Sequence, residues 1–112
     1  MSADNAQDYG REFAQTITEW WKAYEAGEEI EGQDAGDFLS EATYGYTLRP
    51  GAPFRVTLAG GGPSAWLEAT LDEDGDVEDA ALMVAWWSEP VSFRSEAITS
   101  LTRYYAESVR DF

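Results

Sequence analysis

Acidic side chains form the densest group of chemically active residues in this sequence. They alternate around Gly75 in the segment Asp72–Asp79, which reads Asp-Glu-Asp-Gly-Asp-Val-Glu-Asp. Alternating carboxylates beside a glycine match part of a calcium-binding loop. However, the glycine comes too early for the EF-hand pattern, and no bidentate glutamate stands at the twelfth position. The segment therefore predicts a tight hairpin turn, in which glycine supplies the positive φ, and no specific metal site.

The residue types that usually perform catalysis are missing. The sequence contains no cysteine and no histidine, which excludes disulfides and thiolate zinc sites and removes the commonest general base and metal ligand. With 22 Asp and Glu residues, many carboxylate pairs lie close together by chance, and no spacing marks one pair as a catalytic dyad. We therefore expect neither an enzyme nor a cofactor.

The net charge of −15 over 112 residues is the strongest indication of what the protein binds. Lys22 is the single lysine. A field this negative repels nucleic acid and anionic membranes, and it attracts basic proteins or ribonucleoprotein complexes. The first residues, Met-Ser-Ala-Asp-Asn-Ala-Gln-Asp, lack the basic and apolar regions of a signal peptide, and no transmembrane run follows. We expect a cytoplasmic protein.

The sequence predicts two helices, one near each end of the chain. After residues 1–8, which we expect to be frayed, apolar side chains recur at helical spacing from Tyr9 to Ala26, and Gly27 ends this helix. Trp20 and Trp21 cannot both point inward, so one of them is expected to be partly exposed. A second helix is expected from Ser92 or Ser95 to about Val109. Its apolar stripe comprises Ile98, Leu101, Tyr105 and Val109.

Four strands lie between the helices. Alternating apolar residues predict strands at 43–48, 54–59 and 64–71, and Pro50–Gly51 fits the middle of a type II turn. The uncharged run 80–87 predicts a fourth, central strand that is buried on both faces, and residues 88–92 are expected to break the sheet. Short connections favour an antiparallel meander. The sequence thus predicts a single α+β domain over residues 1–112 with two layers: an N-terminal helix, a four-stranded antiparallel meander and a C-terminal helix.

Negative charge is concentrated in the first helix, in the connector 28–36 and in the hairpin 72–79, whereas the last helix is nearly balanced. We therefore expect a partner to bind the acids of the hairpin and the connector. Exposed aromatic residues would serve as anchors, among them Trp66 or one of Trp20 and Trp21. The candidate partner-binding residues are Asp72, Glu73, Asp74, Asp76, Glu78, Asp79, Glu28, Glu29, Glu31 and Trp66.

In size and composition the chain resembles the small acidic inhibitors carried by phages and mobile elements, which include DNA-mimicking anti-CRISPR and antirestriction proteins. The resemblance rests on the acidic segment Asp72–Asp79, the connector acids Glu28–Glu31 and the missing His and Cys. It implies an inhibitor that occupies the basic channel of a nucleic-acid-processing complex or nuclease, in the host cytoplasm if the protein is encoded by a phage.

Four alternatives stay open. An immunity protein against a basic toxin would use the same electrostatics, and an acidic secretion chaperone or adaptor, which can be a homodimer, would bind an extended segment. A small-molecule domain would place its Tyr and Trp residues around a pocket. Adaptation to high salt would also explain the acidity and the scarcity of lysine.

Overall fold

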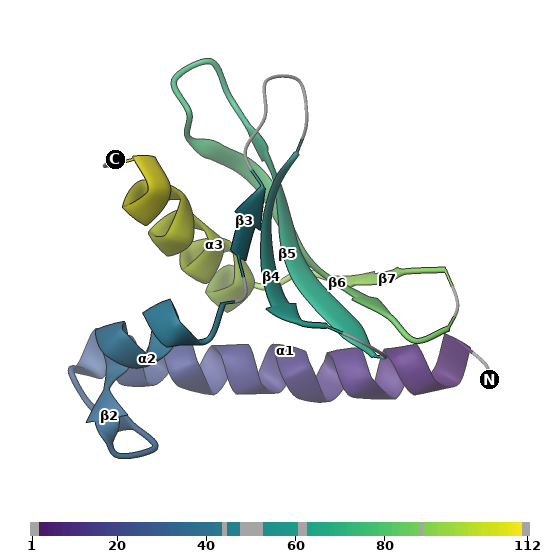
Figure 1. Cartoon of the computed structure of the whole chain (residues 1–112), viewed down its shortest axis with the longest axis horizontal. Helices are drawn as coiled ribbons and strands as arrows, with labels where there is room; N and C mark the ends of the chain where they lie inside the picture. The colour runs from purple at the N-terminus through teal and green to yellow at the C-terminus, as the bar shows by residue number, and fades with distance from the viewer. Residues whose placement is uncertain (1–2, 44, 48–52, 61–62, 88, 111–112) are drawn as a thin grey trace.

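The computed structural model describes residues 3–43, 45–47, 53–60, 63–87 and 89–110. Its helices are α1 (Ala3–Ala26), α2 (Ala35–Glu41) and α3 (Glu96–Arg110). Its strands are β1 (Glu29–Ile30), β2 (Gln33–Asp34), β3 (Gly45–Thr47), β4 (Phe54–Ala59), β5 (Ser64–Leu71), β6 (Val77–Ala85) and β7 (Val91–Phe93). The predicted α+β order of N-terminal helix, antiparallel meander and C-terminal helix is confirmed (Figure 1).

The main sheet has the strand order β3-β4-β5-β6-β7, and every neighbouring pair is antiparallel. The short strands β1 and β2 form a separate hairpin between α1 and α2. The prediction that residues 88–92 break the sheet is wrong at its end, because β7 extends the meander. Val91 pairs with Val84 and Phe93 pairs with Leu82. The side chains of Val91 and Phe93 pack against the core, and this packing holds the short strand in the sheet.

The core lies between one face of the sheet and the helices. Val56, Leu67 and Leu82 are neighbours in register across β4, β5 and β6, and each is fully buried. Helix α1 contributes Ile17 and α3 contributes Leu101 to the same cluster. The alternation that predicted these inward positions is confirmed, and it explains why both long helices pack on this face.

The opposite face of the sheet has no helix over it within the described part of the chain (Figure 1). In β6, Met83 and Ala85 are only half-buried on this face, although the small Ala81 is buried. The prediction that run 80–87 is buried on both faces is therefore wrong. The strand also ends at Ala85, and the Trp87 side chain is 75% exposed.

The two ends of α1 and the N-terminus of α3 each have an identifiable physical cause. Helix α1 ends at Ala26, where Gly27 adopts a φ of +70°, as predicted. It begins at Ala3, earlier than expected, because Ala6 packs into the core and holds residues 3–8 in the helix. The N-terminus of α3 is capped by Ser95, whose Oγ accepts the backbone N–H of Ile98 at 3.1 Å.

The indoles of Trp20 and Trp21 are both half-buried, on two sides of α1. Trp20 packs edge-on against Phe38 of α2, and Trp21 packs against Tyr104 of α3. Both indoles are thus partly exposed, in agreement with the expectation that at least one of them would be, and both also pack against neighbouring helices. The predicted turn at Pro50–Gly51 and the ends of the predicted strand at Tyr44 and Leu48 lie outside the described residues.

Candidate partner-binding surface

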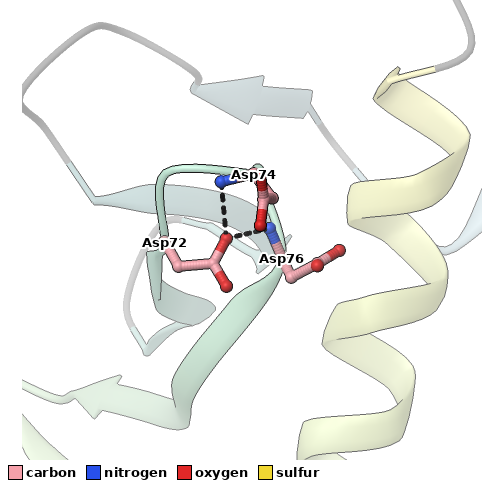
Figure 2. A group of neighbouring side chains, drawn as sticks. All are labelled: Asp72, Asp74 and Asp76. Atoms are coloured by element: carbon pink, nitrogen blue, oxygen red, sulfur yellow. Dashed lines mark hydrogen bonds between the residues drawn. The ribbon is translucent and has the colours of Figure 1, made fainter.

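The acidic tip, residues 72–76, is the loop that joins β5 to β6 at one end of the sheet (Figure 1). The Asp72 carboxylate organises it. Its Oδ1 accepts the backbone N–H groups of Asp74 and Asp76, each at 2.9 Å (Figure 2). The Asp72 N–H donates to the Asp76 carbonyl at 2.8 Å, and Gly75 has the predicted positive φ of +86°. The loop is thus a closed turn with a defined conformation.

This turn brings three carboxylates together. Oxygens of Asp72, Asp74 and Asp76 all lie within 4.8 Å of one another. Asp72 is half-buried, whereas Asp74 and Asp76 are exposed, as are Glu73 in the loop and Glu78 in β6. The cluster attracts cations, but only one oxygen from each of the three carboxylates belongs to it, and calcium takes six to eight oxygen ligands. The expectation of no specific metal site stays a prediction.

Asp79 forms an ion pair with Arg94, from the segment before α3. Arg94 donates to both of its carboxylate oxygens, from Nε to Oδ1 at 3.3 Å and from a terminal nitrogen to Oδ2 at 3.2 Å. The hydrogen bond and the positive charge of Arg94 lower the pKa of Asp79, and Asp79 in turn raises the pKa of Arg94. Both side chains are well exposed, so the pair contributes little to stability. Asp79 is already neutralised and is a poor candidate for binding a basic partner.

The connector acids lie elsewhere. Glu28, Glu29 and Glu31 are exposed around the β1–β2 hairpin, beside α2 and the C-terminal end of α1. In Figure 1 this hairpin is at a different corner of the molecule from the β5–β6 loop. Sequence reasoning grouped the two segments by composition, but the fold separates them into two acidic surfaces.

Trp66 lies on the uncovered face of the sheet, in β5. The Arg55 guanidinium stacks over its ring at 5.4 Å and also pairs with Glu68 at 2.8 Å from Nε to Oε1. The indole is half-buried, and its Nε1 is buried without an acceptor among the described residues. Arg55 therefore covers the predicted anchor, and Trp66 belongs to neither acidic surface.

Trp87 is the most exposed of the large hydrophobic side chains that the structure describes, and sequence reasoning missed it. Its side chain is 75% exposed, and its φ of +53° is unusual for a bulky residue. The preceding Trp86 instead packs edge-on against Tyr9 of α1. The strand ends at Ala85, so strand alternation does not position these two indoles, and the sequence analysis had placed both of them in a buried strand.

A second missed feature is a groove between α1 and α3, which we call the α1–α3 groove. It has a volume of about 940 Å³. Its lining includes the cations Lys22, Arg94 and Arg103. These three residues are far apart in the sequence and form no motif, so sequence analysis could not predict that they line one groove.

Comparison with protein-family models, curated proteins and solved structures finds no match for this chain. Within the described residues, no helix combines the length and apolar character that crossing a membrane requires.

Proposed function

We propose that this protein is an acidic inhibitor. It binds the basic surface of a nucleic-acid-processing complex or nuclease and blocks nucleic-acid binding there. The observation that carries the proposal is the acidic tip, where three carboxylates lie within 4.8 Å of one another at the exposed end of a hairpin. Double-stranded DNA also presents a dense row of negative charges, about one per 1.7 Å of helix axis.

Three properties make the tip suited to a Lys/Arg-rich surface. Carboxylates accept paired hydrogen bonds from guanidinium groups, which adds geometry to charge. The Asp72 hydrogen bonds fix the loop before binding, so less conformational entropy is lost on association. The net charge of −15 speeds encounter with a basic partner.

The geometry reduces the number of acidic residues that we propose to contact a partner. Asp79 is neutralised by Arg94, and Asp72 holds the turn, so the residues best placed to contact a partner are Glu73, Asp74, Asp76 and Glu78. The connector acids form a separate surface that a large partner could reach independently. An immunity protein would bind a basic toxin through the same tip.

The test measures inhibition of nucleic-acid binding by mobility shift, with a panel of purified RNA-guided nuclease complexes and basic nucleases. The tip variant carries Glu73→Lys, Asp74→Lys and Glu78→Lys. The connector variant carries Glu28→Lys, Glu29→Lys and Glu31→Lys, so both change the net charge by about six units. Neither variant alters Asp72, and the folds should survive because exposed charges contribute little to stability.

We expect the parent to inhibit at least one member of the panel, less strongly as salt rises, and the tip variant to be at least about tenfold weaker. The class of target that is inhibited separates the inhibitor from the immunity protein. An equal loss in both variants would assign the effect to net charge alone. The proposal fails if the parent inhibits nothing at micromolar concentration, or if the tip variant inhibits as well as the parent.

A further inference from the structure

The α1–α3 groove has a charge unlike the rest of the molecule. Of seven Lys and Arg residues in the chain, three line it: Lys22 from α1, Arg94 from the segment before α3, and Arg103 from α3. Its acids are also three, Glu25, Asp79 and Glu96, so its formal charge is 3 − 3 = 0. The whole chain carries 22 acids against 7 cations. An anion is therefore repelled less at the groove than the net charge of the whole chain would suggest.

Among the residues that the structure describes, two of the three cations have no ion-pair partner. Arg94 is bound to Asp79, as described above. Lys22 and Arg103 are exposed, and no salt bridge or hydrogen bond of either side chain occurs within the described part of the chain. Their charges are available to a ligand, whereas most cations of an acidic protein would be expected to pair with its many carboxylates.

The remaining lining suits a phosphate ester with a ring. Thr99 and Ser100 line the groove, and their hydroxyls can donate hydrogen bonds to phosphate oxygens, whereas the Thr18 hydroxyl already donates to the Ala14 carbonyl at 3.0 Å. Trp21 also lines it and is half-buried, since its ring stacks on Tyr24 at 5.1 Å. An indole of this kind offers a surface against which a nucleobase can stack. The volume of about 940 Å³ lies within the range of small-molecule sites.

We propose that the α1–α3 groove binds a small phosphate-bearing molecule of about nucleotide size. Lys22 and Arg103 would contact the phosphates and Trp21 the ring. This ligand is different from the partner proposed for the acidic tip, although Arg103 also lines a small pocket with Asp76 of the tip. The groove is proposed to bind an anion and the tip a basic protein, so substitutions can distinguish the two sites.

The test is calorimetric titration of the full chain at 0.15 M salt, where fields beyond about 8 Å are screened. The probes are inorganic pyrophosphate, ADP and adenosine, without divalent cations. We expect ADP and pyrophosphate to bind and adenosine to bind far more weakly. Tighter binding of ADP than of pyrophosphate would assign a contact to the ring.

Charge-matched variants locate the site. Lys22→Gln and Arg103→Gln should each weaken ADP binding at least about tenfold, because each removes a charged hydrogen-bond donor. Arg11→Gln removes the same charge from an exposed position of α1 where Arg11 pairs with Asp8, and it should leave binding unchanged. Glu25→Gln and Glu96→Gln should tighten binding, since each removes a repelling carboxylate from the lining.

The proposal is overturned if neither phosphate compound binds at millimolar concentration, or if adenosine binds as tightly as ADP. It is also overturned if Arg11→Gln weakens binding as much as Lys22→Gln does. Circular dichroism of each variant checks the fold, which these exposed substitutions should preserve.

Discussion

The hydroxyl of Tyr105 donates a 2.7 Å hydrogen bond to the carbonyl oxygen of Leu39, 66 residues earlier in the chain. Both residues are fully buried. The bond ties the C-terminal helix α3 to the short helix α2, and it adds a second donor to a buried carbonyl that also accepts the Ala42 N–H at 3.3 Å. Removing the Tyr105 hydroxyl therefore tests how much this contact between α3 and α2 stabilises the fold.

Replacing Tyr105 with Phe should lower the free energy of unfolding by about 0.5–1.5 kcal/mol, because it removes one buried hydrogen bond while the Leu39 carbonyl keeps the Ala42 N–H as a donor. The neighbouring Tyr104 is the control. Its hydroxyl makes no hydrogen bond within the described residues, so Tyr104→Phe should change stability by less than about 0.5 kcal/mol. Urea denaturation of both variants measures the difference. Equal effects would show that the hydrogen bond contributes nothing.

The same tyrosine should make stability depend on alkaline pH. Burial, together with nearby Tyr46 and Tyr104, raises the pKa of Tyr105 well above its ordinary value. Above pH about 10 the unfolded chain loses this proton while the folded chain keeps it. Stability should therefore fall as pH rises from about 10 toward the raised pKa. Unfolding titrations should show a shallower fall in Tyr105→Phe, and Tyr104→Phe should retain the steeper one.

Gly10 of α1 is fixed by its contact with Phe93 of β7. A Cβ atom at Gly10 would lie closer than 3.0 Å to three atoms of the Phe93 ring. Alanine normally stabilises a helix by about 1 kcal/mol over glycine, but here the overpacking should cost about 1–3 kcal/mol. We expect Gly10→Ala to lower the melting temperature, and Phe93→Leu to restore part of the loss. A higher melting temperature for Gly10→Ala would contradict this packing.

Truncation of the adjacent indoles Trp86 and Trp87 should have different effects on the stability of the fold. Trp86→Ala should destabilise the fold by about 2 kcal/mol, because it removes the half-buried partner of Tyr9. Trp87→Ala should have an effect within about 0.5 kcal/mol. Because Trp87 has a positive φ, Trp87→Gly should be more stable than Trp87→Ala, by about 1 kcal/mol. Thermal denaturation ranks the three variants, and a lower stability for Trp87→Gly would argue against this backbone conformation.

The acidic tip should bind calcium only weakly. Asp72, Asp74 and Asp76 place three carboxylates together, but calcium prefers six to eight oxygens, and the Asp72 Oδ1 already accepts two backbone N–H groups. Calorimetric titration should therefore show no stoichiometric binding at micromolar affinity. Binding of one calcium ion at that affinity, abolished by Asp74→Asn, would make the tip a metal site.

Local patterns in the sequence determined the elements. Period-two alternation gave β4 and β5 at their observed bounds, because one face of each strand must be apolar to reach the core. Gly27 ended α1, Ser95 began α3, and Gly75 marked the tip, since each acts through its own backbone or side chain. The exposure of most tip acids also followed from the sequence, because Asp and Glu side chains are rarely fully buried.

The tertiary structure decided how distant residues combine. It separated the connector acids from the tip, paired Asp79 with Arg94, and covered Trp66 with Arg55. It also left Trp87 exposed and gathered Lys22, Arg94 and Arg103 around one groove. None of these relationships has a local signal, because each depends on how the helices and strands pack in space.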